Sequence, residues 1–165
     1  MDFHVGDPVV HWTYGLGEII SLEERVLTGQ KTLYYVVQIQ DLTVCVPADG
    51  KAISRLRSPT PEGDFPNLTV ILSSPSDSIS DNRLERKTQL LKRLEDGQVE
   101  AICRVIRDLF AYQHRMPLND EDKYILKRAL NSLLGEWVFS MSVTRAQAES
   151  ELRLLLRRSL ENTVT

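Results

Sequence analysis

The spacing of apolar residues changes once along this chain, from alternation near the N-terminus to helical spacing in the second half. In residues 32–40 the apolar side chains alternate along one face, whereas in 98–115 they recur three and four positions apart. Alternation is typical of a β-strand with one buried face, and the longer interval is typical of an amphipathic helix. The 165 residues are enough for two small domains. We therefore predict an α+β fold with a β domain first and a helical domain second.

The first predicted element is a hairpin. Two strand-like runs, 9–12 and 18–22, are separated by a turn that contains Gly15 and Gly17. Glycine adopts positive φ values without a Cβ penalty, so this pair permits a tight reversal or a bulge. Pro8 has no N–H to donate and therefore suits the start of an edge strand. We expect a strongly bent sheet to begin here.

Further strand-like runs complete the N-terminal domain. They cover residues 32–40 and 42–47, and a short closing strand is expected at 52–56. Residues 32–40 are rich in aromatic and β-branched residues, and 42–47 alternates between inward apolar residues and the positions between them. Four or five short strands within about 57 residues predict a small Tudor- or SH3-like β-barrel over residues 1–57.

Prolines and polar residues follow the predicted barrel. Four prolines and a serine-rich run interrupt residues 58–82, which we interpret as a linker. One apolar piece within it, 68–72, is too short for its period to distinguish a strand from a helical turn. The helical domain is then predicted over residues 83–165.

Four helices are predicted in this second domain. The first two cover 83–95 and 98–115, Asn119 can cap the third, and Thr144 opens the fourth with the spacing of a capping box. Trp137 lies on the apolar stripe of the third helix and is expected to be buried. Short connections between four helices are typical of a compact bundle.

Composition and residue spacing argue against several classes of protein. The chain is 42% hydrophobic and 26% charged, and no apolar run reaches the roughly 18–20 residues of a membrane span. The N-terminus lacks the basic and apolar regions of a signal peptide, so we expect a cytoplasmic location. Cys45 and Cys103 are too few and too far apart for a disulfide framework or a zinc site. The three histidines also lack ligand spacing, so no metal or other cofactor is expected.

An enzymatic site is not indicated. No nucleophile lies in a recognisable context, and no glycine-rich phosphate loop is present. Asp120, Glu121 and Asp122 could bind a cation or act as acid and base. Their place directly after Asn119 favours a structural role, because carboxylates stabilise the positive end of a helix dipole. We therefore expect a non-enzymatic protein.

Two features could bind macromolecules. Five basic residues and one acidic residue fall within 83–93, and Arg83, Arg86, Lys87 and Arg93 could meet phosphates at helical spacing. The same residues could instead form a solvated helix face. A free strand at the edge of the β domain could pair with the sheet of a partner, or could be covered by a loop or helix.

Short motifs along almost the full chain resemble one known family. In the first half the matching residues are Phe3, Val5-Gly6-Asp7, Val9-Val10, Gly15, Ile19, Gly29, Tyr34-Tyr35-Val36-Val37, Leu42-Thr43-Val44 and Val46-Pro47. In the second half they are Leu94, Gly97, Val105, Arg107-Asp108-Leu109, Leu118, Leu126, Ala129, Leu133 and Gly135-Glu136. The chain resembles the CarD/CdnL family of bacterial RNA polymerase-binding transcription regulators, whose N-terminal module is shared with the transcription-repair coupling factor. The helicase motifs of a coupling factor are missing, which leaves the stand-alone regulators.

The resemblance implies a transcription regulator that needs no catalytic residue. The N-terminal barrel would dock on the β subunit of RNA polymerase by strand pairing, through Arg25, Thr43, Val44, Cys45, Val46 and Pro47. The helical domain would contact upstream promoter DNA and favour the open complex. The residues we assign to this contact are those of the basic segment, Arg83, Arg86, Lys87 and Arg93. The implied location is the cytoplasm, in association with the nucleoid.

Two positions depart from the family pattern. Cys45 stands where relatives often have a basic contact residue, and Arg83 stands where they have a tryptophan that wedges into the minor groove. An arginine can enter a narrow minor groove without unstacking a base step. These departures leave an alternative open, in which the chain is a protein-interaction adaptor that does not bind DNA and its helical bundle is structural.

Overall fold

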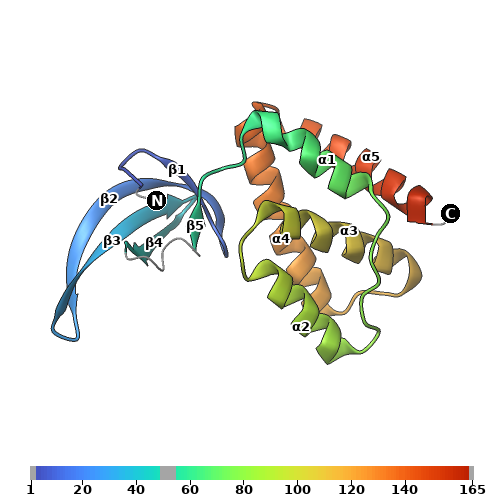
Figure 1. Cartoon of the computed structure of the whole chain (residues 1–165), viewed down its shortest axis with the longest axis horizontal. Helices are drawn as coiled ribbons and strands as arrows, with labels where there is room; N and C mark the ends of the chain where they lie inside the picture. The colour runs from blue at the N-terminus through green and yellow to red at the C-terminus, as the bar shows by residue number, and fades with distance from the viewer. Residues whose placement is uncertain (1–2, 49–54, 164–165) are drawn as a thin grey trace. The chain divides into compact units, whose positions relative to one another are not determined.

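A computed structural model describes residues 3–48 and 55–163, which divide into two compact units, Met1–Pro59 and Thr60–Thr165 (Figure 1). The first unit holds the strands β1 Pro8–His11, β2 Gly15–Leu27, β3 Gln30–Ile39, β4 Leu42–Pro47 and β5 Leu56–Arg57. The second holds a short 3-10 helix, η2 Glu62–Asp64, and the helices α1 Phe65–Ser73, α2 Arg83–Leu94, α3 Val99–Arg115, α4 Asp120–Met141 and α5 Arg145–Thr163. The predicted α+β fold class is confirmed.

The strands form one antiparallel sheet in the order β4-β3-β2-β1-β5, so β4 and β5 lie at its two edges. The long strands β2 and β3 curve together as a bent ribbon (Figure 1). A register shift between Ile19 and Ser21 inserts one extra residue into β2, and such a bulge bends and twists a strand. The inner face buries eight side chains: Phe3, Val9, Ile19, Tyr35, Val37, Ile39, Val46 and Leu56. The predicted closing strand 52–56 falls mostly outside the described residues, and Leu56 pairs with β1.

Gly17 allows two strands to approach closely. A Cβ placed on Gly17 would lie 2.5 Å from Cγ1 of Ile39 and 2.6 Å from the carbonyl oxygen of Gln38. Gly15, at the start of β2, adopts a φ of 88°. The two glycines of the opening hairpin therefore have different tasks: Gly15 permits the reversal, and Gly17 leaves space for β3.

The segment 58–82 is not a linker, and this corrects the sequence-based interpretation. It contains α1, whose Phe65, Leu68 and Leu72 are buried in the core of the helical unit. Their spacing of three and four residues places all three on one side of the helix. Pro66 does not prevent the helix because it lies in the first turn, where a backbone N–H has no helical partner. The helical unit thus has five α-helices among its described residues.

The two helix starts predicted from capping residues are present. Asn119 accepts a hydrogen bond from the backbone N–H of Asp122, and the Asp122 side chain accepts one from the N–H of Asn119. Thr144 and Gln147 make the equivalent reciprocal pair, at 2.9 and 3.1 Å. Trp137 is buried, as predicted, with its ring centroid 5.6 Å from that of Phe65. Local capping chemistry therefore fixes where α4 and α5 begin.

A buried carboxylate holds the beginning of the helical unit against α4. Glu136, on α4, is fully buried, and its Oε2 accepts hydrogen bonds from the backbone N–H of Thr60 at 2.7 Å and from the Thr60 hydroxyl at 2.6 Å. A buried carboxylate is stable only when such donors replace its hydration. Glu136 therefore fixes the chain where the second unit starts.

Candidate functional site

Strand β4, which contains five of the predicted polymerase contacts, is an edge strand. The backbone N–H of Ala48 donates a hydrogen bond to the carbonyl oxygen of Leu33 at 2.8 Å. From this pair onward, hydrogen-bonded and non-hydrogen-bonded residue pairs alternate along β3 and β4. In this alternation Val44 and Val46 bond to β3, whereas the backbone groups of Thr43 and Cys45 point away from it. In the described part of the chain no strand pairs on that side. Thr43 and Cys45 can therefore bond to the strand of another molecule.

Pro47 ends this free edge. It lies opposite Tyr34 in a pair that exchanges no backbone hydrogen bonds, so its missing N–H is no loss to the sheet. The side chains of the strand divide between the two faces. Val46 is buried in the inner core and Val44 packs against it, whereas Cys45, a partly exposed free thiol, lies on the opposite face.

Arg25 lies on the same face of the sheet as Cys45. It belongs to β2, is about half exposed, and donates a hydrogen bond from Nη2 to Oε2 of Glu23 at 3.1 Å. This bond, followed by the charge interaction with the nearby Cys45, raises the pKa of the Arg25 guanidinium above its usual range. The structure thus brings a permanently charged guanidinium close to the free edge of β4, with Glu23 as its present partner.

Arg83 is exposed and Lys87 is half-buried on α2. Both approach the same carboxylate oxygen of Glu121 on α4, at 3.8 Å and 3.4 Å, and their side chains are 67% and 43% exposed. Asn82 caps the helix by accepting hydrogen bonds from two backbone N–H groups. Surface ion pairs of this length contribute little to stability, so both cations can exchange Glu121 for a phosphate.

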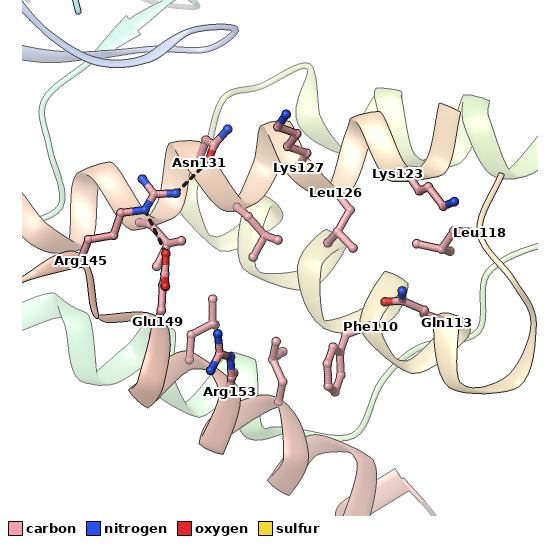
Figure 2. Close-up of a pocket in the computed structure, with 14 residues that line it drawn as sticks. Phe110, Gln113, Leu118, Lys123, Leu126, Lys127, Asn131, Arg145, Glu149 and Arg153 are labelled. Atoms are coloured by element: carbon pink, nitrogen blue, oxygen red, sulfur yellow. Dashed lines mark hydrogen bonds and ion pairs between the residues drawn. The ribbon is translucent and has the colours of Figure 1, made fainter. Parts of the chain in front are cut away.

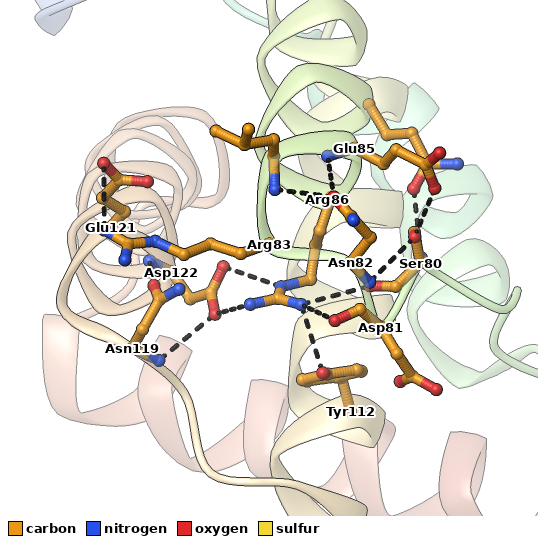
Figure 3. A network of polar contacts seen from close by, with 12 residues as sticks. Ser80, Asp81, Asn82, Arg83, Glu85, Arg86, Tyr112, Asn119, Glu121 and Asp122 are labelled. Carbon is orange, nitrogen blue, oxygen red and sulfur yellow. Dashed lines mark hydrogen bonds and ion pairs between the residues drawn. The ribbon is translucent and has the colours of Figure 1, made fainter.

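Arg86 is not available to DNA, which corrects the prediction for this residue. Its guanidinium is buried and makes two parallel bonds to Asp122, at 3.0 Å from Nε and 2.8 Å from Nη2 (Figure 3). Nη1 donates to the hydroxyl of Tyr112 and to the backbone carbonyl of Ser80. The hydrogen bond with Asp122 raises the pKa of Arg86 despite the opposing effect of burial. Arg86 therefore joins α2 to α3 and α4.

Arg93 is also largely engaged within the protein. Its Nη1 bonds to Oδ2 of Asp108 at 2.8 Å, and its side chain is 31% exposed. Asp108 is buried and also accepts from Nε of Arg107, which in turn pairs with Asp77. Of the four predicted DNA contacts, only Arg83 and Lys87 therefore have charged groups at the surface, where each forms a weak ion pair with Glu121.

Sequence reasoning missed one feature of α2. Leu84 is 73% exposed, more than any other large apolar side chain among the described residues. Leu84, Lys87 and Leu91 follow at intervals of three and four, so they form a single exposed stripe. The seven-residue spacing of Leu84 and Leu91 was the available signal. It places them off the buried stripe of Arg86, Leu90 and Leu94.

Comparison with known proteins identifies the family. A model of the CarD-like/TRCF RID domain matches residues 3–57, and a model of the CarD C-terminal domain matches residues 67–153. The chain belongs to the CarD family. It is 28% identical over 153 residues to the "Putative transcription factor YdeB" of Bacillus subtilis (strain 168), an alignment that covers 90% of this chain and 98% of that protein.

Membership confirms two predictions. CarD proteins are transcription factors without enzymatic activity, and the suspected resemblance to this family was correct. The RID domain is the module that binds the polymerase β subunit in this family.

Among the described residues, no helix is long and apolar enough to cross a membrane. No group of three potential metal ligands occurs among them either.

Proposed function

We propose that the chain docks on the β subunit of RNA polymerase through the free edge of β4 and contacts promoter DNA through α2. The observation that carries the first half is the outward backbone of Thr43 and Cys45 beside the charged Arg25. Edge pairing supplies backbone hydrogen bonds, and nearby side chains supply specificity. Val44, Val46 and Pro47 shape the strand rather than contact the partner directly.

The DNA-binding half of the proposal rests on the exposed side chains of α2. Arg83 and Lys87 supply positive charge and Leu84 supplies an apolar surface next to Arg83. Cations attract the phosphate backbone without reading sequence, whereas an inserted apolar side chain acts on a base step. Arg86 and Arg93 support this surface from within the protein. The proposal places the protein in the cytoplasm, with the nucleoid.

The regulatory effect follows from a shift in populations. A docked protein whose α2 contacts the melted promoter better than the closed one favours the open complex by the difference in binding free energy. A difference of about 1.4 kcal/mol changes the ratio of open to closed complexes tenfold. The chain's own residues need only bind, and no bond is made or broken.

A proline substitution tests the docking half. Cys45→Pro removes an outward N–H without removing a hydrogen bond to β3, because Cys45 belongs to a pair that exchanges none. We expect the full chain to lose binding to the isolated β-subunit lobe in a pull-down, while its thermal unfolding remains close to that of the unsubstituted protein. Unchanged binding by a folded Cys45→Pro protein would rule out pairing at this edge.

An arginine substitution tests the DNA half. Arg83→Ala should shorten the lifetime of the open promoter complex and reduce the dependence of DNA binding on salt concentration, because one phosphate contact is lost. Arg158→Ala, which removes an exposed cation from α5, serves as the matched control. An adaptor that does not bind DNA would show no salt-dependent DNA binding, and the two variants would then behave alike.

A further inference from the structure

A groove in the helical unit is lined by residues that belong to neither proposed contact surface. It has a volume of about 530 Å³ and is bounded by α4 and α5, with the end of α3 contributing to its floor (Figure 2). Its apolar lining consists of Phe110, Leu118, Leu126, Leu130, Leu134, Leu152 and Leu156. Phe110, Leu126 and Leu130 are only partly buried, so this part of the core is open to a partner.

Basic side chains line the rim of the groove. Lys123 and Lys127 project from α4, and Arg145 and Arg153 project from α5 (Figure 2). Arg145 is engaged by Glu149 at 3.0 Å and by Asn131 at 2.9 Å. Lys123, Lys127 and Arg153 have no ion pair or side-chain hydrogen bond among the described residues. The rim therefore carries excess positive charge on both sides of an apolar floor.

The dimensions of the groove favour a helix as its occupant. Its lining follows α4 from Lys123 to Leu134, which is about three turns or roughly 16 Å at 1.5 Å per residue. Amphipathic helices bind such grooves through apolar residues at i, i+3, i+4 and i+7. Because the rim is positively charged, acidic residues on the flanks of the bound helix would complement it. We propose that this groove binds an acidic amphipathic helix of a partner protein.

The groove and the α2 surface can be occupied together. Successive residues on a helix are rotated by about 100°, so Lys123 and Lys127 lie on the side of α4 opposite Glu121. Glu121 is the residue that faces Arg83 and Lys87 of α2. A helix bound in the groove would therefore leave α2 free to contact DNA. The inference thus adds a third partner to the two proposed above and does not depend on either.

A synthetic peptide provides the test. We would label a peptide of about 15 residues, the length at which an isolated helix becomes marginally stable, with leucines at i, i+3, i+4 and i+7 and glutamates on both flanks. Its binding to the full chain is followed by fluorescence anisotropy at low and high salt. Matched peptides carry lysine for glutamate, or serine for leucine. We expect saturable binding of the acidic amphipathic peptide only, weakened by salt.

Variants locate the binding. The double substitution Lys127→Glu and Arg153→Glu reverses two exposed charges and should weaken peptide binding about tenfold or more, whereas Arg83→Ala should leave it unchanged. Leu126→Ser should weaken it without altering the salt dependence. Thermal unfolding of each variant confirms that it is folded.

Three results would overturn the proposal. One is absence of saturable binding by the acidic peptide, and another is equal binding of the lysine peptide. The third is self-association of the chain through this face, seen as a dimer in sedimentation that the charge reversal dissociates, because the occupant would then be a second copy. If dodecanoate below its micelle concentration binds and the peptide does not, the groove is a site for a small anionic amphiphile instead.

Discussion

Arg86 and Asp122 form a buried ion pair, and we expect the loss of one partner to destabilise the helical unit. Both side chains are almost inaccessible, and the pair joins α2 to α4 through two hydrogen bonds. Arg86→Ala leaves the Asp122 carboxylate buried without its main partner, a change that destabilises proteins by about 3–5 kcal/mol. Urea unfolding followed by the circular dichroism of the helices measures the loss.

The neighbouring Arg83 provides the control for this prediction. Arg83→Ala removes a charge of the same kind from an exposed position 3.8 Å from Glu121, and it should change the free energy of unfolding by less than about 0.5 kcal/mol. Similar effects of the two substitutions would mean that burial does not distinguish the two arginines.

These two arginines also mark how far the sequence could predict the site. Charge and helical spacing placed Arg83, Arg86 and Lys87 together on one basic helix, and two of the three are exposed. The partner of Arg86 is 36 residues away, at a capping position of another helix, and no local pattern announces it. The exposure of Leu84 could have been predicted from the sequence. Leu84 and Leu91 are seven residues apart and share one side of the helix, and this side differs from the one that buries Leu90 and Leu94.

At the scale of elements, Gly17 determines how closely β2 approaches β3. A methyl group at this position would overlap Ile39 and the backbone carbonyl of Gln38, and the backbone cannot move without disturbing the sheet. We expect Gly17→Ala to destabilise the β unit by about 1–3 kcal/mol, a cost typical of overpacking. The thermal unfolding of the sheet, followed by Trp12 fluorescence in a Trp137→Phe background, measures it.

Gly135 should respond in the opposite direction. It lies within α4, and a Cβ there would meet no atom within 4 Å. Alanine in a helix is favoured over glycine by up to about 1 kcal/mol, so Gly135→Ala should stabilise the helical unit by about 0.5–1 kcal/mol. The urea midpoint of the helical signal should rise. A fall would contradict the prediction and would mean that α4 does not accommodate a side chain at Gly135.

The elements themselves differ in how well the sequence predicts them. Alternation in 32–40 and 42–47 indicated β3 and β4, and the capping residues Asn119 and Thr144 indicated where α4 and α5 begin. Helix α1 was missed because prolines surround it, although Pro66 is compatible with a first turn. Its three buried side chains are recognisable as core only when α3 and α5 are present to cover them.

At the scale of the whole molecule, the two proposed contacts would have separable effects. In the proposed function, docking through β4 would set how much protein is needed to occupy the polymerase. The proposed contact between α2 and DNA would set how far the occupied complex is shifted towards opening. The intact chain also gives α2 a high local concentration at the promoter once the β unit is bound. The proposal therefore assigns each unit a different parameter of the same response.

The concentration dependence of open-complex lifetime distinguishes these parameters. Cys45→Pro should raise the midpoint, the protein concentration that gives half of the maximal increase in open-complex lifetime, by about tenfold or more. The plateau, which is the maximal lifetime, should stay unchanged, because docking is weaker but the bound state is the same. Arg83→Ala should lower the plateau with little shift in the midpoint, because occupancy is retained and the difference between melted and closed DNA is smaller. A plateau lowered by Cys45→Pro would mean that the edge strand itself senses the state of the promoter. A midpoint shifted by Arg83→Ala as strongly as by Cys45→Pro would mean that DNA contact, rather than the polymerase, recruits the protein.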